Sequence, residues 1–360
     1  MNLLNCSFKQ LQDILVGMQE KPFHANQLFR WMHQHFIDDF EQMTNLPKSL
    51  RAKLAEQYNI TTPQLVSEKI ASDGTIKWLL AVDAVNKIET VFIPEESRYT
   101  LCISSQAGCA LNCHFCSTAQ QGFNRNLTIA EIIGQLFFAN QSLKPRGITI
   151  TNVVMMGMGE PLTNYKAVVH AMQTMLHDHA YGLSRRRVTL STSGIVPRII
   201  DLATDCPVSL AISIHASNDE VRSKIMPIND KHNIEELLNA CMHYIPYSPR
   251  HFVTFEYVML KDINDSLTHA KELAKLLYNV PCKVNLIPFN PFPQTDFVCS
   301  DSKQINIFKE ALIKHSKKVV TVRKTRGEDV DAACGQLAGS ILNKKVVHKL
   351  HVLKESTQDL

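Results

Sequence analysis

Apolar and polar residues change their spacing twice along the chain. In the first sixty or so residues, apolar side chains recur at intervals of three or four, which is typical of amphipathic helices. From Thr75 onward, two apolar runs at 77–82 and 87–93 flank a short polar break, a pattern that indicates a β-hairpin. We therefore predict a small helical domain over residues 1–72 and a connecting β-hairpin over residues 73–98.

Beyond residue 100, strand-like runs alternate with amphipathic stretches. Six such runs lie at 100–105, 151–157, 187–192, 207–214, 251–259 and 281–287. Six successive β-α units predict a parallel sheet, because each crossover helix returns the chain to the same end of the sheet. We expect an α/β fold in which residues 99–325 form a partial, TIM-like (β/α)6 barrel, with the active site at the carboxyl ends of the strands. A further strand at 318–323 leads into a C-terminal loop and tail over 326–360.

The composition is that of a globular protein. The chain has 360 residues, of which 45% are hydrophobic and 20% charged, enough for one main domain and a smaller one. No run reaches the roughly 18–20 apolar residues that a membrane helix needs, and the first residues lack the pattern of a signal peptide. We therefore expect a cytoplasmic protein without membrane contact. Ten cysteines in such a chain indicate metal or redox chemistry.

Charge is distributed unevenly along the chain. The net charge is +4, and residues 1–98 hold 10 Lys or Arg against 12 Asp or Glu, whereas the remaining residues hold 28 against 22. The weak total permits a nucleic-acid partner without requiring one. Basic surface is therefore expected on the main domain, where the candidate chemistry also lies.

Three cysteines share one short loop after the first strand of the β-α series. Cys109, Cys113 and Cys116 have the spacing C-x3-C-x2-C. Three thiolates can hold three irons of a 4Fe–4S cubane and leave the fourth iron open to a ligand from outside the protein. An open iron can bind the amino and carboxylate groups of S-adenosylmethionine (SAM) and pass an electron to its sulfonium. The spacing therefore predicts a cluster that cleaves SAM homolytically.

Two other metal sites fit this loop less well. Structural zinc usually has four protein ligands in two paired groups, and the sequence has no second C-x2-C or H-x3-H pair. A ferredoxin-like electron carrier needs a fourth cysteine nearby, and none is placed for it.

Polar and glycine residues follow the later strands. Gly157, Gly159 and Glu160 end the second strand, where absent side chains let the backbone approach SAM closely. Further candidates for hydrogen bonds to SAM are Ser191, the segment Ser213-Ile214-His215, and Asn290. Each of these residues alone is more often a turn residue or a helix cap.

Longer stretches carry a resemblance to a known family. They are residues 109–125, residues 153–161, and residues 323–327 leading to Ala333-Cys334-Gly335-Gln336-Leu337. Over roughly residues 20–345, the chain resembles the RlmN/Cfr family of radical SAM RNA methyltransferases. It departs from the family pattern mildly at Ile214, where leucine is usual, and at Phe289, where tryptophan is usual.

The resemblance implies roles for individual residues. Cys334 corresponds to a cysteine that is methylated, Cys102 to its disulfide partner and Glu89 to a proton acceptor. The implied SAM contacts are Gly159, Glu160, Ser191, Ser213, Ile214, His215 and Asn290. The residues alone indicate plainer roles, since Cys102 reads as a buried strand cysteine and Glu89 as an exposed hairpin carboxylate.

The resemblance also implies a reaction and its partners. The expected activity is methylation of adenine carbon 2 in 23S rRNA, at the peptidyl transferase centre, and in tRNA, 3′ of the anticodon, through a methyl-cysteine intermediate and two SAM molecules. Alternatives are methylation of carbon 8 in 23S rRNA, or a non-catalytic, zinc-stabilised RNA-binding protein. We expect an electron donor such as flavodoxin with its reductase, an RNA-binding role for the N-terminal domain, and a monomer. Arg185 to Arg187 and residues 323–326 are expected to form a basic lip that guides phosphates.

Overall fold

The computed structural model describes residues 1–293, 295–333, 335–337 and 340–341. Three α-helices form the N-terminal domain, and they are α1 (Phe8–Gly17), α2 (Phe23–His33) and α3 (Lys48–Gln57). Helix α1 begins where the Ser7 side chain accepts from the Gln10 N–H and the Gln10 side chain accepts from the Ser7 N–H, a capping box. The helical spacing of the first sixty residues therefore predicted real helices.

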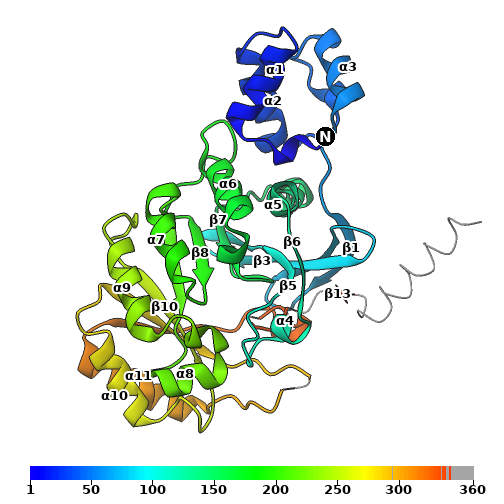
Figure 1. Cartoon of the computed structure of the whole chain (residues 1–360). Helices are drawn as coiled ribbons and strands as arrows, with labels where there is room; N and C mark the ends of the chain where they lie inside the picture. Colours follow the sequence, from blue (N-terminus) through cyan, green and yellow to red (C-terminus); the bar gives the residue numbers. More distant parts are fainter. Residues whose placement is uncertain (294, 334, 338–339, 342–360) are drawn as a thin grey trace, which may run out of the picture.

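The N-terminal domain packs on the main domain through aromatic rings. The Phe8 and Phe29 rings lie 4.8 and 5.2 Å from the ring of His177, which follows α6 (Tyr165–Leu176). Burial lowers the pKa of His33 to about 3, with a smaller contribution from His177. The histidines of this interface are therefore packing groups. Helices α1 and α2 lie beside α6 in Figure 1.

The main domain is built on one long sheet. Its strands are β1 (Gln64–Ile70), β2 (Ile76–Ala81), β3 (Asn86–Glu95), β4 (Arg98–Cys102), β7 (Asn152–Met155), β8 (Val188–Thr192), β9 (Ser209–Ser213), β10 (Val253–Met259), β11 (Cys282–Pro288) and β12 (Val319–Val322), with β13 (Ser340–Ile341) pairing to β3. Neighbours from β4 to β12 are parallel. The predicted parallel series of six β-α units is confirmed, and among the described strands the sheet stays open rather than closing into a full barrel.

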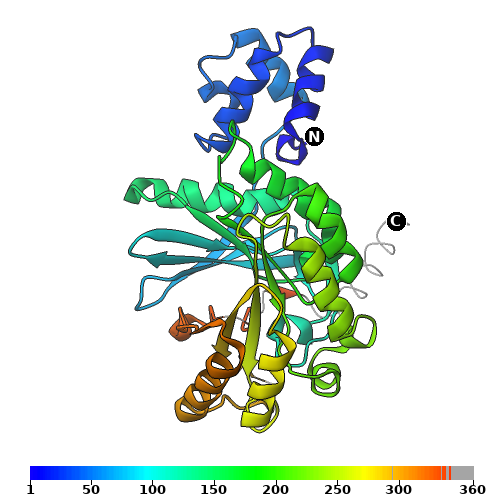
Figure 2. The same ribbon diagram turned by 90° about the vertical axis from the view of Figure 1, so that its left-hand side faces the viewer.

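Helices cover the outer face of this sheet, as Figure 2 shows. They are α5 (Ile129–Leu143), α6, α7 (Val196–Asp205), α8 (Asp219–Ile225), α9 (Ile234–Tyr244), α10 (Leu267–Leu276) and α11 (Ser302–Ser316). Short 3-10 helices are Leu3–Asn5, Phe40–Gln42, Lys144–Arg146, Pro161–Asn164, Pro227–Asp230 and Glu328–Val330. Two further strands, β5 (Gln106–Gly108) and β6 (Phe123–Asn126), and the short helix α4 (Ser117–Gln120) frame the cysteine loop.

The segment before residue 98 differs from its prediction in two ways. Strand β1 lies within residues 1–72, where only helices were expected, and the predicted hairpin β2–β3 is not a linker but part of the main sheet, antiparallel to β4. Every residue of β1 is exposed, so its sequence lacks the alternation that marks a half-buried strand.

Strand register gives the sheet two unlike faces, because directly paired residues of neighbouring strands project to the same side. On the outer face, Val153, Leu190 and Phe255 are completely buried. The inner face is more polar. Its register runs through the pairs Lys77↔Val91, Val91↔Cys102, Cys102↔Val154, Ser191↔Ala211, Ser213↔Glu256, Glu256↔Asn285 and Asn285↔Thr321. This face therefore lines the site.

Candidate active site

A cavity lies on the inner face of the sheet, at the carboxyl ends of the parallel strands, as the sequence predicted. Residues that line it include Met156, Gly157, Gly159, Glu160, Ser191, Ser193, Ser213, His215, Glu256, Asn290 and Arg323, together with the cysteine loop and Gly335. Parallel strands all end at the same edge of the sheet. Residues more than 130 positions apart in the sequence therefore meet in one cavity.

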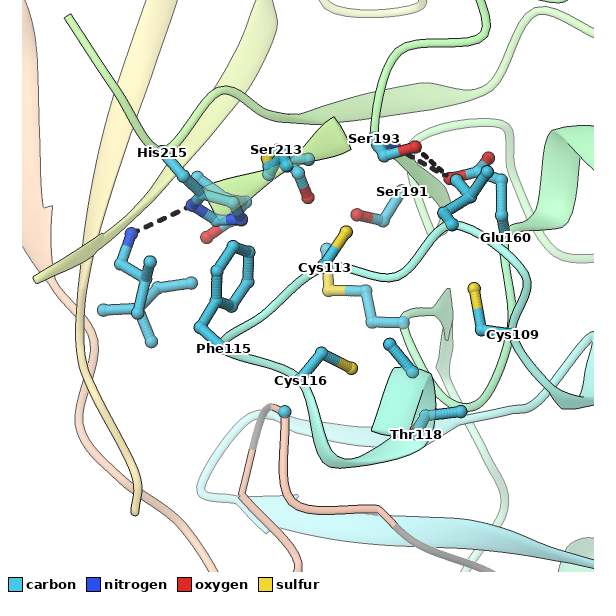
Figure 3. Close-up of a pocket in the computed structure, with 18 of the residues that line it drawn as sticks. Cys109, Cys113, Phe115, Cys116, Thr118, Glu160, Ser191, Ser193, Ser213 and His215 are labelled. Carbon is cyan, nitrogen blue, oxygen red and sulfur yellow. Dashed lines mark hydrogen bonds between the residues drawn. The ribbon is translucent and has the colours of Figure 1, made fainter. Parts of the chain in front are cut away.

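The cysteine loop runs along one wall of this cavity. Figure 3 shows the sulfur atoms of Cys109, Cys113 and Cys116 pointing into the same space. Gly108 and Asn112, with φ of 77° and 53°, allow the loop its sharp bends, since glycine and asparagine tolerate the left-handed region. The loop is anchored from outside, because the His114 N–H donates to the Ile225 carbonyl, 3.0 Å away.

The electrostatics of these thiols favour a bound metal cluster. Burial raises the pKa of Cys109 to about 12 and that of Cys113 well above its usual value, and the thiols also repel one another's charge. Thiolates in such a place need cationic metal to remain ionised. Three convergent, partly buried cysteine sulfurs are a donor set that fits three irons of a cubane.

Glu160 is fixed at the cavity by three donors. Its Oε2 accepts from the Ser193 N–H at 2.8 Å and the Ser193 hydroxyl at 2.9 Å, and its Oε1 accepts from the Leu162 N–H at 3.0 Å. Burial raises the pKa of this carboxyl, against the opposing effect of those hydrogen bonds. The arrangement joins the loop after β7 to the end of β8.

Two glycines let the backbone after β7 pass close to Ile103 and Gln106. At Gly157 a Cβ atom would lie 2.7 Å from the Ile103 carbonyl oxygen, and at Gly159, where φ is +96°, it would lie 2.5 Å from Gln106 Cβ. Both positions therefore exclude larger residues for steric reasons. The predicted close approach of this backbone to SAM stays a prediction.

His215 stands at the end of β9 with φ of 53°. The Val258 N–H donates to its Nδ1 at 2.9 Å, so the neutral ring carries its hydrogen on Nε2. Burial, with a smaller contribution from Arg222, lowers the pKa of His215 to about 3. The ring therefore stays neutral at physiological pH and lies edge-on to Phe115 (Figure 3).

Arg222, on α8, supports the strand ends that form the site, and it was not predicted from the sequence. It is completely buried and donates to the carbonyls of Ser193, Ser213 and Ile214, at 2.6, 3.2 and 3.1 Å. It thereby ties the ends of β8 and β9 together. Nothing in its local sequence distinguishes it from an exposed helical arginine.

The other residues predicted to contact SAM do not all line the cavity. Ser191, Ser213 and Asn290 line the cavity, whereas Ile214 is buried and is missing from the described residues that line it. The Ile214 backbone rather than its side chain contributes, through its carbonyl bond to Arg222.

Glu256, which the sequence did not indicate, lies in the cavity next to Arg323 of the expected basic lip. Glu256 Oε1 accepts from Asn285 Nδ2 at 3.0 Å, and Oε2 lies 3.7 Å from Arg323 Nη1. Burial raises the pKa of Glu256, partly offset by Arg323. Only the cross-strand register shows that these side chains share the inner face with Ser213.

Glu89 and Cys102 lie on the same inner face, on the antiparallel side of the sheet. Both are buried, at 7% and 8% exposure, so the reading of Glu89 as an exposed carboxylate is wrong. Lys77 Nζ lies 3.1 Å from Glu89 Oε1. Cys334 is outside the described residues, but its neighbour Gly335 lines the cavity and accepts from the Ser117 N–H of α4 at 2.8 Å.

Comparison with known proteins agrees with this geometry. Residues 1–60 match the ribosomal RNA large subunit methyltransferase N-terminal domain, and residues 103–275 match the radical SAM superfamily. A radical SAM methyltransferase from Sphaerobacter thermophilus is 41% identical, with a TM-score of 0.88, over 94% of this chain and 99% of that chain. The chain belongs to the RlmN family of radical SAM methyltransferases.

More distant solved structures also match. A domain of a pyruvate-formate lyase-activating enzyme from Bacteroides vulgatus is 12% identical, with a TM-score of 0.38, over 48% of this chain and 99% of that chain. The FeFe-hydrogenase maturase HydG from Carboxydothermus hydrogenoformans is 14% identical, with a TM-score of 0.47, over 67% and 57%.

As an RlmN-family member, the chain is a radical SAM methyltransferase whose cofactors are a 4Fe–4S cluster and SAM. Cys109, Cys113 and Cys116 are the residues that fit the cluster, and the strand ends around Gly159, Ser191 and Ser213 border the space beside it. Within the described ranges, no helix is long and apolar enough to cross a membrane.

The expected basic lip is only partly present in this RlmN-family structure. Arg185 to Arg187 precede β8 and lie at the amino end of the strand, where Arg186 Nε donates to the Pro249 carbonyl at 3.0 Å. The cavity lies at the opposite end of the strands, so the prediction is wrong for these three arginines. Arg323 follows β12 and lines the cavity.

Proposed function

We propose that this chain methylates carbon 2 of adenine in 23S rRNA, at the peptidyl transferase centre, and in tRNA, at the adenine 3′ of the anticodon. The observation that carries the proposal is one inner sheet face that holds Glu89 and Cys102 and continues to the cavity with the cysteine loop. The resemblance of residues 117–125 to the family pattern supports carbon 2 over carbon 8.

The chemistry explains why a radical route is needed. Carbon 2 of adenine is not nucleophilic, so it cannot displace the methyl group of SAM directly. When bound, the cluster and SAM supply a 5′-deoxyadenosyl radical, and a second SAM supplies the methyl group. The protein must therefore carry the methyl carbon, remove a proton from the base and release the product.

Three side chains are proposed to perform these tasks. Cys334 accepts the methyl group as a thiolate. After this S-methyl group has lost a hydrogen atom to the 5′-deoxyadenosyl radical and its carbon has bonded to the adenine, Glu89 takes the proton from carbon 2, and the electrons of that C–H bond stay in the base. Cys102, as a thiolate, then bonds to the Cys334 sulfur as the sulfur–carbon bond breaks, and the one surplus electron that the radical brought to the base would return to the oxidised cluster. The electron pair of the broken bond stays on the new methyl carbon, which takes up a proton.

The surroundings of position 334 support this scheme. The Gly335 carbonyl accepts a hydrogen bond from the Ser117 N–H at the start of α4, which follows the cysteine loop. The Lys77 ammonium donates to the Asp331 carbonyl at 3.0 Å, beside Glu89. Disulfide formation requires Cys102 and Cys334 to come within about 4.4–6.8 Å between α-carbons. The C-terminal segment is thus attached on both sides of position 334.

SAM binding is proposed for the strand ends. The backbone of Gly159 and Glu160 would meet the amino group, while Ser191, Ser213, His215 and Asn290 would donate to or accept from the ribose, carboxylate and adenine. His215 suits a donor role because its Nε2 carries the hydrogen. Ile214 would contribute its backbone, in keeping with its buried side chain.

The RNA partner is proposed to deliver an unstacked adenine to this cavity. A base within structured RNA must leave its stack to reach a buried site. Arg323, which lines the cavity, and Arg326, three positions further along the chain, are candidates for phosphate contacts, and the N-terminal domain is proposed to add further RNA contacts. A flavodoxin-type electron donor and a monomeric enzyme complete the proposal.

The test is anaerobic incubation of reconstituted protein with methyl-labelled SAM, reductant and total RNA, followed by mass spectrometry of nucleosides. We expect 2-methyladenosine from the native chain and none from Cys334→Ala. Label at carbon 8 would contradict the proposal and would show the alternative activity, methylation of carbon 8. Label at carbon 2 with Cys334→Ala would show that no methyl-cysteine is involved.

A further inference from the structure

Lys77 is a buried cation next to the proposed base, and nothing in the motifs pointed to it. We propose that Lys77 is a positioning residue that orients the Glu89 carboxylate toward the C-terminal segment for proton removal. The inference rests on the proposed function, in which Glu89 receives the proton from carbon 2.

Strand register accounts for the meeting of the two side chains. Lys77 pairs with Val91, and Glu89 lies two residues before Val91 on the same strand, so both side chains project to the inner face. Both are buried, and Lys77 Nζ lies 3.1 Å from Glu89 Oε1. A buried lysine requires a compensating anion, and Glu89 supplies it.

The same ammonium reaches the C-terminal segment. Lys77 Nζ donates to the Asp331 carbonyl at 3.0 Å, three positions before Cys334. One cation therefore contacts both the proposed base and the segment that carries the proposed methyl acceptor. The ammonium has three N–H donors, so one lysine can serve both acceptors.

The segment has other attachments that do not involve Lys77. The Ser72 N–H donates to Asp329 Oδ2 at 2.9 Å, and the Gly327 N–H donates to Asp73 Oδ2 at 3.3 Å. Arg326 Nη1 lies 3.6 Å from the same Asp73 oxygen. Loss of the Lys77 contact should therefore leave the segment docked while Glu89 loses its orientation.

The proposed effect on the reaction concerns one step. The C–H bond at carbon 2 breaks, its proton goes to a carboxylate oxygen of Glu89, and its electron pair remains in the base. Contact of Lys77 with Oε1 fixes the orientation of the carboxylate before transfer. Without the ammonium, the Glu89 carboxylate would lose this orientation, and proton transfer from carbon 2 would slow.

The experiment compares Lys77→Met, Lys77→Arg, Glu89→Gln and Lys69→Met in anaerobically reconstituted full-length protein. Lys69 is the matched control, because it is the cross-strand partner of Lys77 on β1 but is exposed. Two stages are measured separately for each variant: S-methylation of Cys334 by labelled SAM, and methylation of a tRNA substrate. Denaturing gels report any covalent protein–RNA adduct.

For Lys77→Met we expect S-methylation near the wild-type rate, RNA methylation reduced about 10²-fold, and accumulation of the same adduct as in Glu89→Gln. Lys77→Arg should recover most of the lost rate because it keeps the charge, and Lys69→Met should behave as wild type. Unchanged RNA methylation in Lys77→Met, or equal loss at both stages, would overturn the inference. If Glu89→Gln methylates RNA normally, the proposed role of Glu89 fails as well.

Discussion

The two sides of the inner sheet face are built in different ways. On the cluster side, one loop supplies Cys109, Cys113 and Cys116, and the ends of parallel strands supply Glu160, the serines and His215. On the antiparallel side, Lys77, Glu89 and Cys102 come from three strands and share one face only through their register. The first side depends on local spacing, whereas the second depends on tertiary pairing.

The difference also appears in the electrostatics. The thiols on the cluster side lose their charge by burial until a metal compensates it. On the antiparallel side, the compensating charge is already present in the Lys77–Glu89 pair. Damage to the cluster side should therefore abolish cofactor chemistry, while damage to the antiparallel side should leave the cofactors bound and stop a later step.

The largest expected effect comes from Cys113→Ala. Removing one of three ligands should abolish the cluster, its broad absorption near 400 nm and RNA methylation, because no other described cysteine reaches the cavity. Iron analysis and assay of 5′-deoxyadenosine check this. Cys241→Ala, in the core, should retain the cluster. A variant of Cys113 that still releases 5′-deoxyadenosine would contradict the assignment.

Glu89→Gln tests the antiparallel side. We expect RNA methylation to fall by about 10²–10⁴-fold, the usual contribution of a positioned base, while iron content and SAM cleavage stay at wild-type levels. Parallel assays of iron, 5′-deoxyadenosine and methylated RNA separate the two outcomes. Loss of the cluster in this variant would mean that the two sides are not independent.

Gly159→Ala tests steric closeness on the cluster side. An alanine at φ of +96°, with its Cβ 2.5 Å from Gln106 Cβ, should cost about 1–3 kcal/mol and weaken SAM binding by roughly ten- to a hundred-fold. Equilibrium dialysis of SAM against reconstituted protein measures the change. Gly147→Ala is a matched control, because Gly147 also has positive φ but no heavy atom within 4 Å of the added Cβ. Equal loss in both variants would count against a local effect.

The smallest expected effect comes from Asp73→Ala, which removes the attachments of Gly327 and Arg326. Each is worth about 1 kcal/mol, so S-methylation of Cys334 and RNA methylation should both decline several-fold. This pattern differs from that of Lys77→Met, in which only the later stage should slow. Rates of both stages in one preparation provide the measurement.

Much of the architecture followed from sequence pattern alone. The strand-like runs at 151–157, 187–192 and 251–259 contain β7, β8 and β10, because apolar residues that pack under helices keep a regular period. Strand β1 was missed because all its residues are exposed. The prediction that Arg185 to Arg187 lie at the cavity was wrong because these residues lead into the start of the strand predicted at 187–192, and so lie at its amino end, whereas the cavity lies at the carboxyl ends of the strands.

The sequence by itself determined the cysteine spacing, the order of β-α units and the polar residues at strand ends, since each depends on neighbours within a few positions. Only the tertiary structure decided that Glu89 is buried against Lys77, that Arg222 clamps two strand ends and that Glu256 faces the cavity. The Lys77–Glu89 contact joins residues 12 positions apart, the Arg222–Ser193 contact 29 positions and the Ser213–Glu256 pair 43 positions. The contacts within the sheet depend on which face each strand turns inward. That choice is made by strand pairing, because a shift of one residue would reverse it.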